Sequence, residues 1–194
     1  MDHSGTKILR PRQILLFSGH MIDAPGRTLP RFPLNKATIA EAEIMRVLDK
    51  LDANHEDLAL TQGASGGDLI FAECCQAKNV NIQFLQPFTE QTFIEQSVIP
   101  SEGDWHNRYL VVKKKAAIQV RAMPEAFLID NGNPFEACNE WLLETALDYG
   151  AEKVRFICLW NGEGGDGAGG TAHMVEQVQK SGGSVIWLNT KQLW

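Results

Sequence analysis

The sequence predicts an α/β fold, with a doubly wound, mainly parallel sheet of five strands and helices on both faces. Three observations predict it. Short apolar runs alternate along the chain with longer segments in which apolar residues recur at helical spacing. The apolar runs are continuous, as is typical of strands that are covered on both faces. Two glycine-rich loops each follow an apolar run and lead directly into a helical segment.

The elements follow one another in a regular order. The expected strands are 13–17, 58–61, 81–85, 154–160 and 185–188, and the expected helices are 36–53, 69–78, 89–98, 104–117, 135–150 and 171–180. The segment 126–129 is either a short strand or a buried segment without regular structure. In the common doubly wound order the first strand lies beside the fourth, and ligands bind outside the carboxyl ends of the strands at that point. The segments after the first, second and fourth strands should therefore meet.

Length, charge and cysteine content narrow the possible classes of protein. The 194 residues fit one domain that spans 1–194. A net charge of −6 argues against a general nucleic-acid surface, and a solvated helix face explains the basic run 113–115. No apolar run approaches the ~18–20 residues of a membrane span, and the first residues lack a signal-peptide core. We therefore expect a cytoplasmic protein with no membrane partner, and its four cysteines as buried thiols in a reducing compartment.

The loop 62–68 has two possible roles. Ser65 and Asp68 have the spacing of a capping box at a helix start, which is a purely structural role. Alternatively, Gly66 and Gly67 bring backbone amides against a phosphate or a ribose, with Asp68 beside them. Both roles can hold together. The chain has neither a P-loop nor a Gly-x-Gly-x-x-Gly after its first strand, which argues against a P-loop ATPase and an ordinary dinucleotide dehydrogenase.

The loop after the fourth strand is the stronger candidate for a ligand site. Gly169, Gly170 and Thr171 stand at a helix start, where unpaired amides and the helix dipole suit a phosphate. Glu176 lies about two turns into this helix, and its carboxylate either faces a bound sugar or is simply solvated. His173 of the same helix is a candidate acid or base, although a structural role is more common for a lone histidine.

The loop after the first strand supplies the third group of candidates. Ser18, Gly19 and His20 come directly after the strand, and Arg27 and Arg31 follow in a long polar segment that could close over an anion. No third histidine or cysteine has suitable spacing, so no metal site is predicted. No other cofactor is expected.

The order of elements and the two glycine loops resemble the SLOG superfamily, which comprises LOG-like and SMF/DprA-like proteins. The resemblance covers residues 13–188. Gly66-Gly67 corresponds to the first glycine loop of that superfamily, and the segment 168–176 corresponds to Pro-Gly-Gly-x-Gly-Thr-x-x-Glu, with Gly169, Gly170 and Glu176 in register. Ala168, Ala172 and His173 depart from that motif. The segments around 138–141 and 159–174 look more like the bacterial signalling and defence branch.

The resemblance implies a Rossmann-like nucleotide-binding domain that senses a nucleotide or a nucleotide-derived small molecule. The first alternative is a nucleoside 5′-monophosphate phosphoribohydrolase, in which Glu176 would stabilise an oxocarbenium-like state and Arg108 would hold the phosphate. The second alternative is a protein-interaction module with a vestigial site. A homo-oligomer or a partner effector protein is compatible with each of these hypotheses.

Overall fold

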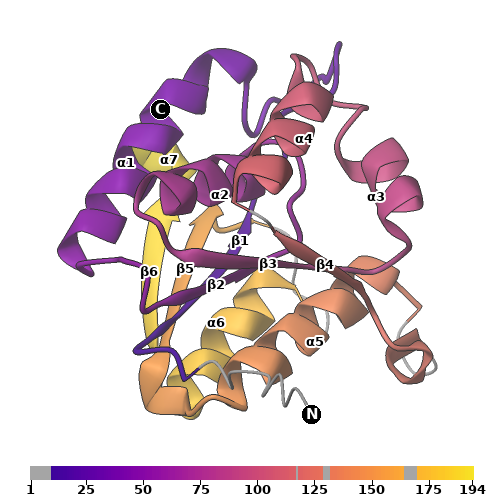
Figure 1. Cartoon of the computed structure of the whole chain (residues 1–194). Coiled ribbons are helices and arrows are strands. Elements are labelled where there is room, and N and C mark those ends of the chain that lie inside the picture. Colours follow the sequence, from indigo (N-terminus) through magenta and orange to yellow (C-terminus); the bar gives the residue numbers. More distant parts are fainter. Residues whose placement is uncertain (1–9, 117, 129–131, 164–169) are drawn as a thin grey trace.

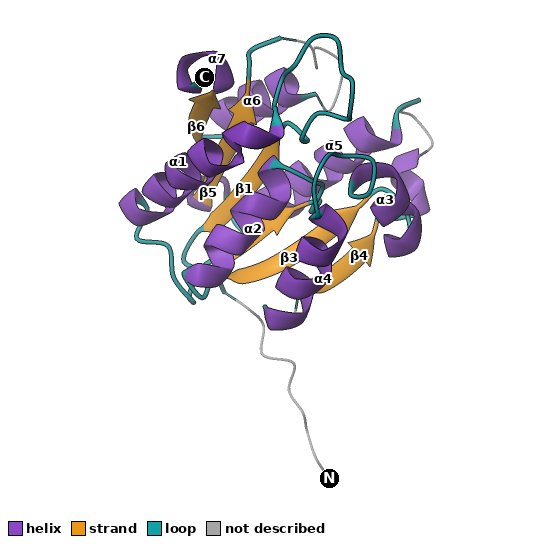
Figure 2. Cartoon of the chain, turned by 90° about the horizontal axis from the view of Figure 1, so that it is seen from above, coloured by secondary structure: helices purple, strands orange, loops and turns teal. Residues whose placement is uncertain are grey.

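The computed structural model describes residues 10–116, 118–128, 132–163 and 170–194, which form a parallel sheet of six strands in the order β4-β3-β2-β1-β5-β6. Figure 2 shows the strands side by side and running in the same direction. The strands are β1 (Ile14–Gly19), β2 (Leu58–Thr61), β3 (Asn81–Gln86), β4 (Gln119–Ala122), β5 (Val154–Trp160) and β6 (Ser184–Asn189). The predicted α/β, doubly wound class is confirmed, and the predicted number of five strands is corrected to six.

The helices cover both faces of the sheet, as Figure 1 shows. They are α1 (Ala37–Lys50), α2 (Gly67–Ala77), α3 (Glu90–Ser97), α4 (Trp105–Lys115), α5 (Pro134–Leu147), α6 (Thr171–Lys180) and α7 (Thr190–Leu193), with short 3-10 segments η1 (Leu34–Lys36), η2 (Glu125–Leu128) and η3 (Ala151–Lys153). One face packs against α1, α2 and α4, and the other packs against α5 and α6. None of the helices in the described part of the chain is both long enough and apolar enough to cross a membrane.

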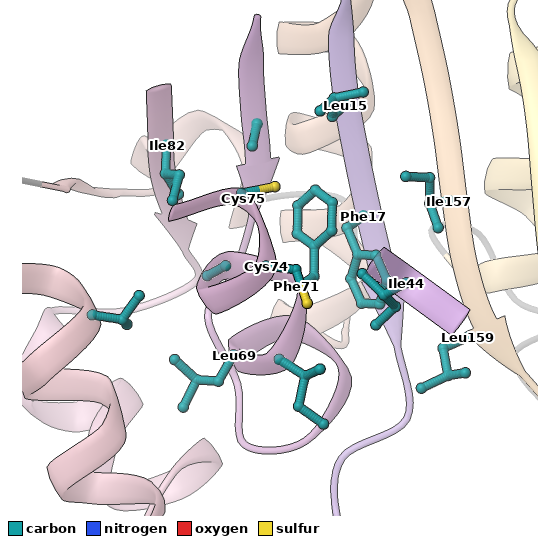
Figure 3. Close-up of a cluster of buried hydrophobic side chains, with 14 of the residues drawn as sticks. Leu15, Phe17, Ile44, Leu69, Phe71, Cys74, Cys75, Ile82, Ile157 and Leu159 are labelled. Atoms are coloured by element: carbon teal, nitrogen blue, oxygen red, sulfur yellow. The ribbon is translucent and has the colours of Figure 1, made fainter. Parts of the chain in front are cut away.

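Strand β1 contributes side chains to a hydrophobic core on each face of the sheet. Successive side chains of a strand point to opposite faces, so Leu15 and Phe17 join the cluster under α1 and α2 while Ile14 and Leu16 join the cluster under α5 and α6. Figure 3 shows the first of these clusters, in which the Phe17 ring stacks on the Phe71 ring of α2 with centroids 4.6 Å apart. A strand buried on both faces reads as a continuous apolar run, which is why β1 was predictable.

Strand β4 was missed because it lies at the edge of the sheet. Of its four residues only Val120 is half-buried, and the other three are exposed. An edge strand with one buried side chain has no apolar run to reveal it. The alternative strand at 126–129 is wrong for the residues that the structure describes there, because Glu125–Leu128 forms η2.

All four cysteines are free and buried. Burial raises the pKa of the Cys74 and Cys158 thiols to about 12, and it raises the pKa of Cys75 and Cys138 as well. Two of these thiols, Cys74 and Cys75 of α2, belong to the cluster of Figure 3. The prediction of buried thiols is confirmed.

Candidate functional site

The strand order places a crevice at the carboxyl ends of β1 and β5. Strand β1 pairs with β2 on one side and with β5 on the other. Strands β2 to β4 are added on the first side and strands β5 and β6 on the second, so the strand order reverses at β1. A cavity of about 250 Å³ lies at these strand ends, and we call it the switch-point pocket. Its lining residues are Phe17, Ser18, Gly19, Met21, Gln62, Ala64, Asp68, Ser97, Phe135, Asn139 and Thr171.

Four of the residues predicted from sequence line this pocket together. Ser18 and Gly19 end β1, Asp68 lies in the first turn of α2, and Thr171 is the first residue of α6. Gly170 is the N-cap of α6, and no side chain caps this helix start. The structure therefore brings the three predicted loops to one place. Gly169, predicted beside Gly170, lies outside the described residues.

Gly66 and Gly67 have a packing role in this arrangement. The Gly67 N–H donates to the His20 carbonyl at 3.0 Å. Gly66 has a φ of +88°, and a Cβ on it would lie 2.5 Å from the Ile22 backbone nitrogen. The glycine pair therefore lets the start of α2 lie directly against the backbone of residues 20–22. The Gly67 amide, predicted to face a phosphate, is engaged with the protein itself.

The predicted capping box does not form. The N-cap of α2 is Gly66 and receives no side-chain hydrogen bond. Ser65 instead forms a buried hydrogen bond with the Ser101 hydroxyl, which also donates to the Ile22 carbonyl at 3.0 Å. The sequence spacing was compatible with a box, but a glycine one residue later takes the cap position because only it can approach the first loop so closely.

Asp68 is a buried carboxyl group at the pocket wall. Its Oδ2 accepts from the Gly63 N–H at 3.2 Å and from the Ala64 N–H at 3.4 Å, so it holds the loop that precedes α2. Burial raises the pKa of Asp68 to about 6, and these hydrogen bonds oppose the rise. At neutral pH the group is therefore mostly an ionised acceptor that lines the pocket.

Ser97 is the most informative residue that sequence reasoning missed. It is the last residue of α3, it is buried, and it lines the pocket. Its Oγ has no hydrogen-bond partner within the described part of the chain. A buried hydroxyl is normally paired, so an unpaired one at a cavity wall is a candidate ligand contact. Gln62 and Asn139, which share a 2.7 Å hydrogen bond at the same wall, were also missed.

His20 ties the first loop to the end of β5. Its backbone N–H donates to the Leu159 carbonyl at 2.9 Å, and its Nε2 accepts from the Asn161 N–H at 3.2 Å. Burial, and next the charge of Arg31, lower the pKa of His20 to about 4. The ring is therefore neutral at physiological pH and serves as an acceptor, which suits a structural role better than that of a proton donor.

The remaining predicted residues do not line the switch-point pocket. Glu176 is exposed and forms a 2.6 Å ion pair with Lys180 on the outer face of α6. Arg108 forms a two-pronged ion pair with Glu73 of α2, and its guanidinium stacks on the Trp105 ring at 4.0 Å. His173 is half-buried in the first turn of α6. Arg108 therefore joins two helices, and Glu176 pairs with Lys180 at the exposed surface of α6.

The arrangement of possible metal-binding side chains was also compared with that of a metal site. In the described ranges of the chain, no three or more His, Cys, Asp or Glu side chains are grouped so that they could hold a metal ion.

Comparison with solved structures gave three matching chains, two of which are described below. No protein-family model matches the chain, and no curated protein matches it in sequence. A structural-genomics target designated TM1055 superposes with a TM-score of 0.45 at 14% identity, over 89% of this chain and 72% of that one. DNA processing protein A (DprA) from Streptococcus pneumoniae superposes with a TM-score of 0.33 at 12% identity, over 95% of this chain. This chain spans 62% of the DprA chain. At these scores neither likeness assigns a function.

Proposed function

We propose that this chain binds a nucleotide or a nucleotide-derived small molecule and acts as a ligand-sensing domain. The observation that carries the proposal is the convergence of three segments on the switch-point pocket, with Ser18, Asp68 and Thr171 at its wall. Doubly wound sheets bind ligands at this position because the crevice is open there and helix starts point into it.

The phosphate would lie at the start of α6. The first amides of a helix have no partner within the helix, and together with the dipole they attract an anion. No side chain caps α6 at Gly170, and Thr171 lines the pocket. The Thr171 hydroxyl and the first-turn amides are therefore suitable donors to phosphate oxygens.

The ribose would lie deeper, between Asp68 and Ser97. The Asp68 carboxylate accepts a hydrogen bond from a sugar hydroxyl, and the Ser97 hydroxyl gains the partner that it lacks. A volume of about 250 Å³ is below the ~300–1,000 Å³ of pockets that enclose a drug-sized ligand. The pocket therefore suits the ribose and phosphate of a nucleotide, with the base outside it.

Thermal unfolding with AMP, ADP and ADP-ribose tests the proposal. A ligand present at 100 times its Kd stabilises the folded state by about 2.7 kcal/mol, which is a measurable shift. The substitution Thr171→Val keeps the side-chain shape but removes the hydroxyl, so we expect an affinity at least about tenfold weaker. The matched control on the same helix is Glu176→Gln, which should leave the affinity unchanged because Glu176 pairs with Lys180 on the exposed face.

Two outcomes would overturn the proposal. If none of the three nucleotides raises the unfolding temperature, the protein-interaction module remains as the hypothesis. Equal affinity of the wild type and Thr171→Val would place the ligand elsewhere. Release of free base during the incubation, abolished in Glu176→Gln, would instead support the phosphoribohydrolase hypothesis.

A further inference from the structure

A second, larger cavity lies beside the long loop that follows β1. Its volume is about 520 Å³, and we call it the loop cavity. It is lined by Arg27, Leu29, Pro30 and Arg31 of the loop, by Asn161 and Glu163 after β5, and by Thr190, Lys191 and Trp194 after β6. None of these residues lines the switch-point pocket.

Cationic side chains outnumber carboxylate side chains in the lining of the loop cavity, although the chain as a whole carries a net charge of −6. Arg27, Arg31 and Lys191 line it, against a single carboxylate, that of Glu163. Glu163 forms an ion pair with Lys191, and Arg27 lies 3.3 Å from an Asp23 oxygen and donates to the Leu29 carbonyl at 2.9 Å. The guanidinium of Arg31 has no hydrogen bond or ion pair with any residue that the structure describes. An arginine side chain at a cavity wall without a bonded partner is a candidate anion contact.

Asp23 binds the backbone of Arg31 and not its guanidinium. This buried carboxylate accepts from the Arg31 N–H at 3.0 Å and from the Phe32 N–H at 3.0 Å, so it fixes the backbone of the loop. The Asp23 N–H in turn donates to the Phe32 carbonyl at 2.9 Å. The loop is therefore held in place before any ligand arrives, which lowers the entropy cost of binding. Desolvation and next the charge of Arg27 lower the pKa of Arg31, and the charge of the nearby Asp23 opposes this shift.

The wall of the loop cavity also has an apolar part. Leu29 is 79% exposed, and Pro30 and Trp194 lie beside it in the lining. The Trp194 ring stacks on the buried Phe32 ring with centroids 5.1 Å apart, which fixes the indole. Cations next to exposed apolar and aromatic surface suit a ligand that joins a phosphate to a ring.

We propose that the loop cavity is a second binding site, for a phosphorylated ligand whose phosphate is held by Arg27 and Arg31 and whose ring packs on Leu29, Pro30 and Trp194. The site is separate from the switch-point pocket and does not depend on the function proposed for it. Its volume lies within the range of pockets that enclose a ligand of nucleotide size.

Calorimetric titration with inorganic pyrophosphate and with AMP tests the site on the full chain. Arg31→Gln keeps the backbone N–H that binds Asp23, so the loop should stay in place while a charge-assisted contact is lost. We expect about tenfold weaker pyrophosphate binding. Glu163→Gln has the opposite expectation, because it removes the one carboxylate of the lining, and we expect about two- to fivefold tighter binding. The control for Arg31→Gln is Arg46→Gln on the exposed face of α1. It also removes one positive charge, but away from the cavity, and should leave pyrophosphate binding unchanged.

The two arms distinguish the class of ligand and the two sites. Tighter binding of AMP than of pyrophosphate, lost in Arg31→Gln, supports a nucleotide in the loop cavity. The reverse order overturns the contact proposed between the ring of the ligand and the apolar part of the wall. Equal pyrophosphate affinity of wild type, Arg31→Gln and Glu163→Gln, or no pyrophosphate binding, overturns the proposal. In that case nucleotide binding that depends on Thr171 would still stand, because the switch-point pocket is separate. Conversely, nucleotide binding that depends on Arg31 and not on Thr171 would support the loop cavity and overturn the function proposed for the switch-point pocket.

Discussion

The unpaired Ser97 hydroxyl makes an unusual prediction about stability. A buried hydroxyl without a partner costs about 1–3 kcal/mol, so Ser97→Ala removes a penalty from the protein without ligand. The loss of one oxygen atom leaves a small void that offsets part of this gain. We expect a net stabilisation of up to about 1 kcal/mol, or a rise in Tm of about 2–4 °C for a chain of this size.

The same substitution should weaken the ligand. The hydroxyl would gain its hydrogen bond only when the ribose is present, and a net hydrogen bond contributes about 0.5–1.5 kcal/mol. We therefore expect nucleotide affinity to fall about two- to tenfold in Ser97→Ala. Differential scanning calorimetry without ligand, followed by titration with the tightest nucleotide of the panel, measures both effects on one sample.

Ser101→Ala is the matched control, since Ser101 is also buried but its hydroxyl is fully used. It bonds to Ser65 and donates to the Ile22 carbonyl, so its removal leaves two buried groups unpaired and should destabilise the protein by about 1–3 kcal/mol. A drop in Tm for Ser97→Ala equal to that for Ser101→Ala would refute the reasoning. Unchanged nucleotide affinity in Ser97→Ala would remove Ser97 from the site.

Three further predictions concern stability. Gly66→Ala should destabilise the protein by more than about 3 kcal/mol in urea unfolding, because it adds a backbone clash to a positive φ. Gly182→Ala is the control and should cost only about 1 kcal/mol, since Gly182 has a φ of +90° and open space around it. Equal costs would contradict the close packing at Gly66. The pKa of His20 is lowered to about 4, so between the ordinary value of 6.5 and about 4 only the unfolded chain takes up this proton, and stability falls as the pH falls. Asp68, whose pKa is raised to about 6, takes up its proton first in the folded chain and so acts in the opposite sense below that pH. Asp68→Asn should therefore steepen the loss of stability on acidification, and His20→Gln should remove the part of that loss between pH 6.5 and about 4. Parallel pH profiles of unfolding free energy would refute this. Arg108→Ala should lower stability by about 1 kcal/mol through its lost ion pair and stacking while leaving nucleotide affinity unchanged, and a loss of affinity would return Arg108 to the site.

The fold was predictable where burial leaves a pattern in the sequence. Strand β1 is covered on both faces and is apolar throughout its first four residues, and α1 repeats apolar residues at helical spacing. Strand β4 pairs only with β3 and buries little beyond Val120, so its sequence shows neither pattern. Pairing at a sheet edge is a tertiary property, which local sequence does not encode strongly.

The candidate site was only partly predictable. Glycine-rich loops and strand order brought Ser18, Asp68 and Thr171 to one place, because parallel strands all end at the same edge. The sequence does not distinguish a glycine that lets a ligand approach from one that lets two backbone segments pack closely. Gly66 is of the second kind. Ser97 left no pattern, since a hydroxyl becomes notable only when its surroundings lack a partner for it.

The buried thiols make the chain convenient for site-specific labelling. A thiol reacts as the thiolate, and burial with raised pKa values keeps Cys74, Cys75, Cys138 and Cys158 protonated near neutral pH. A maleimide dye should therefore leave the native chain unmodified and attach to a single introduced cysteine. Leu29→Cys would place the dye at the rim of the loop cavity, where fluorescence reports ligand binding without removal of any native cysteine.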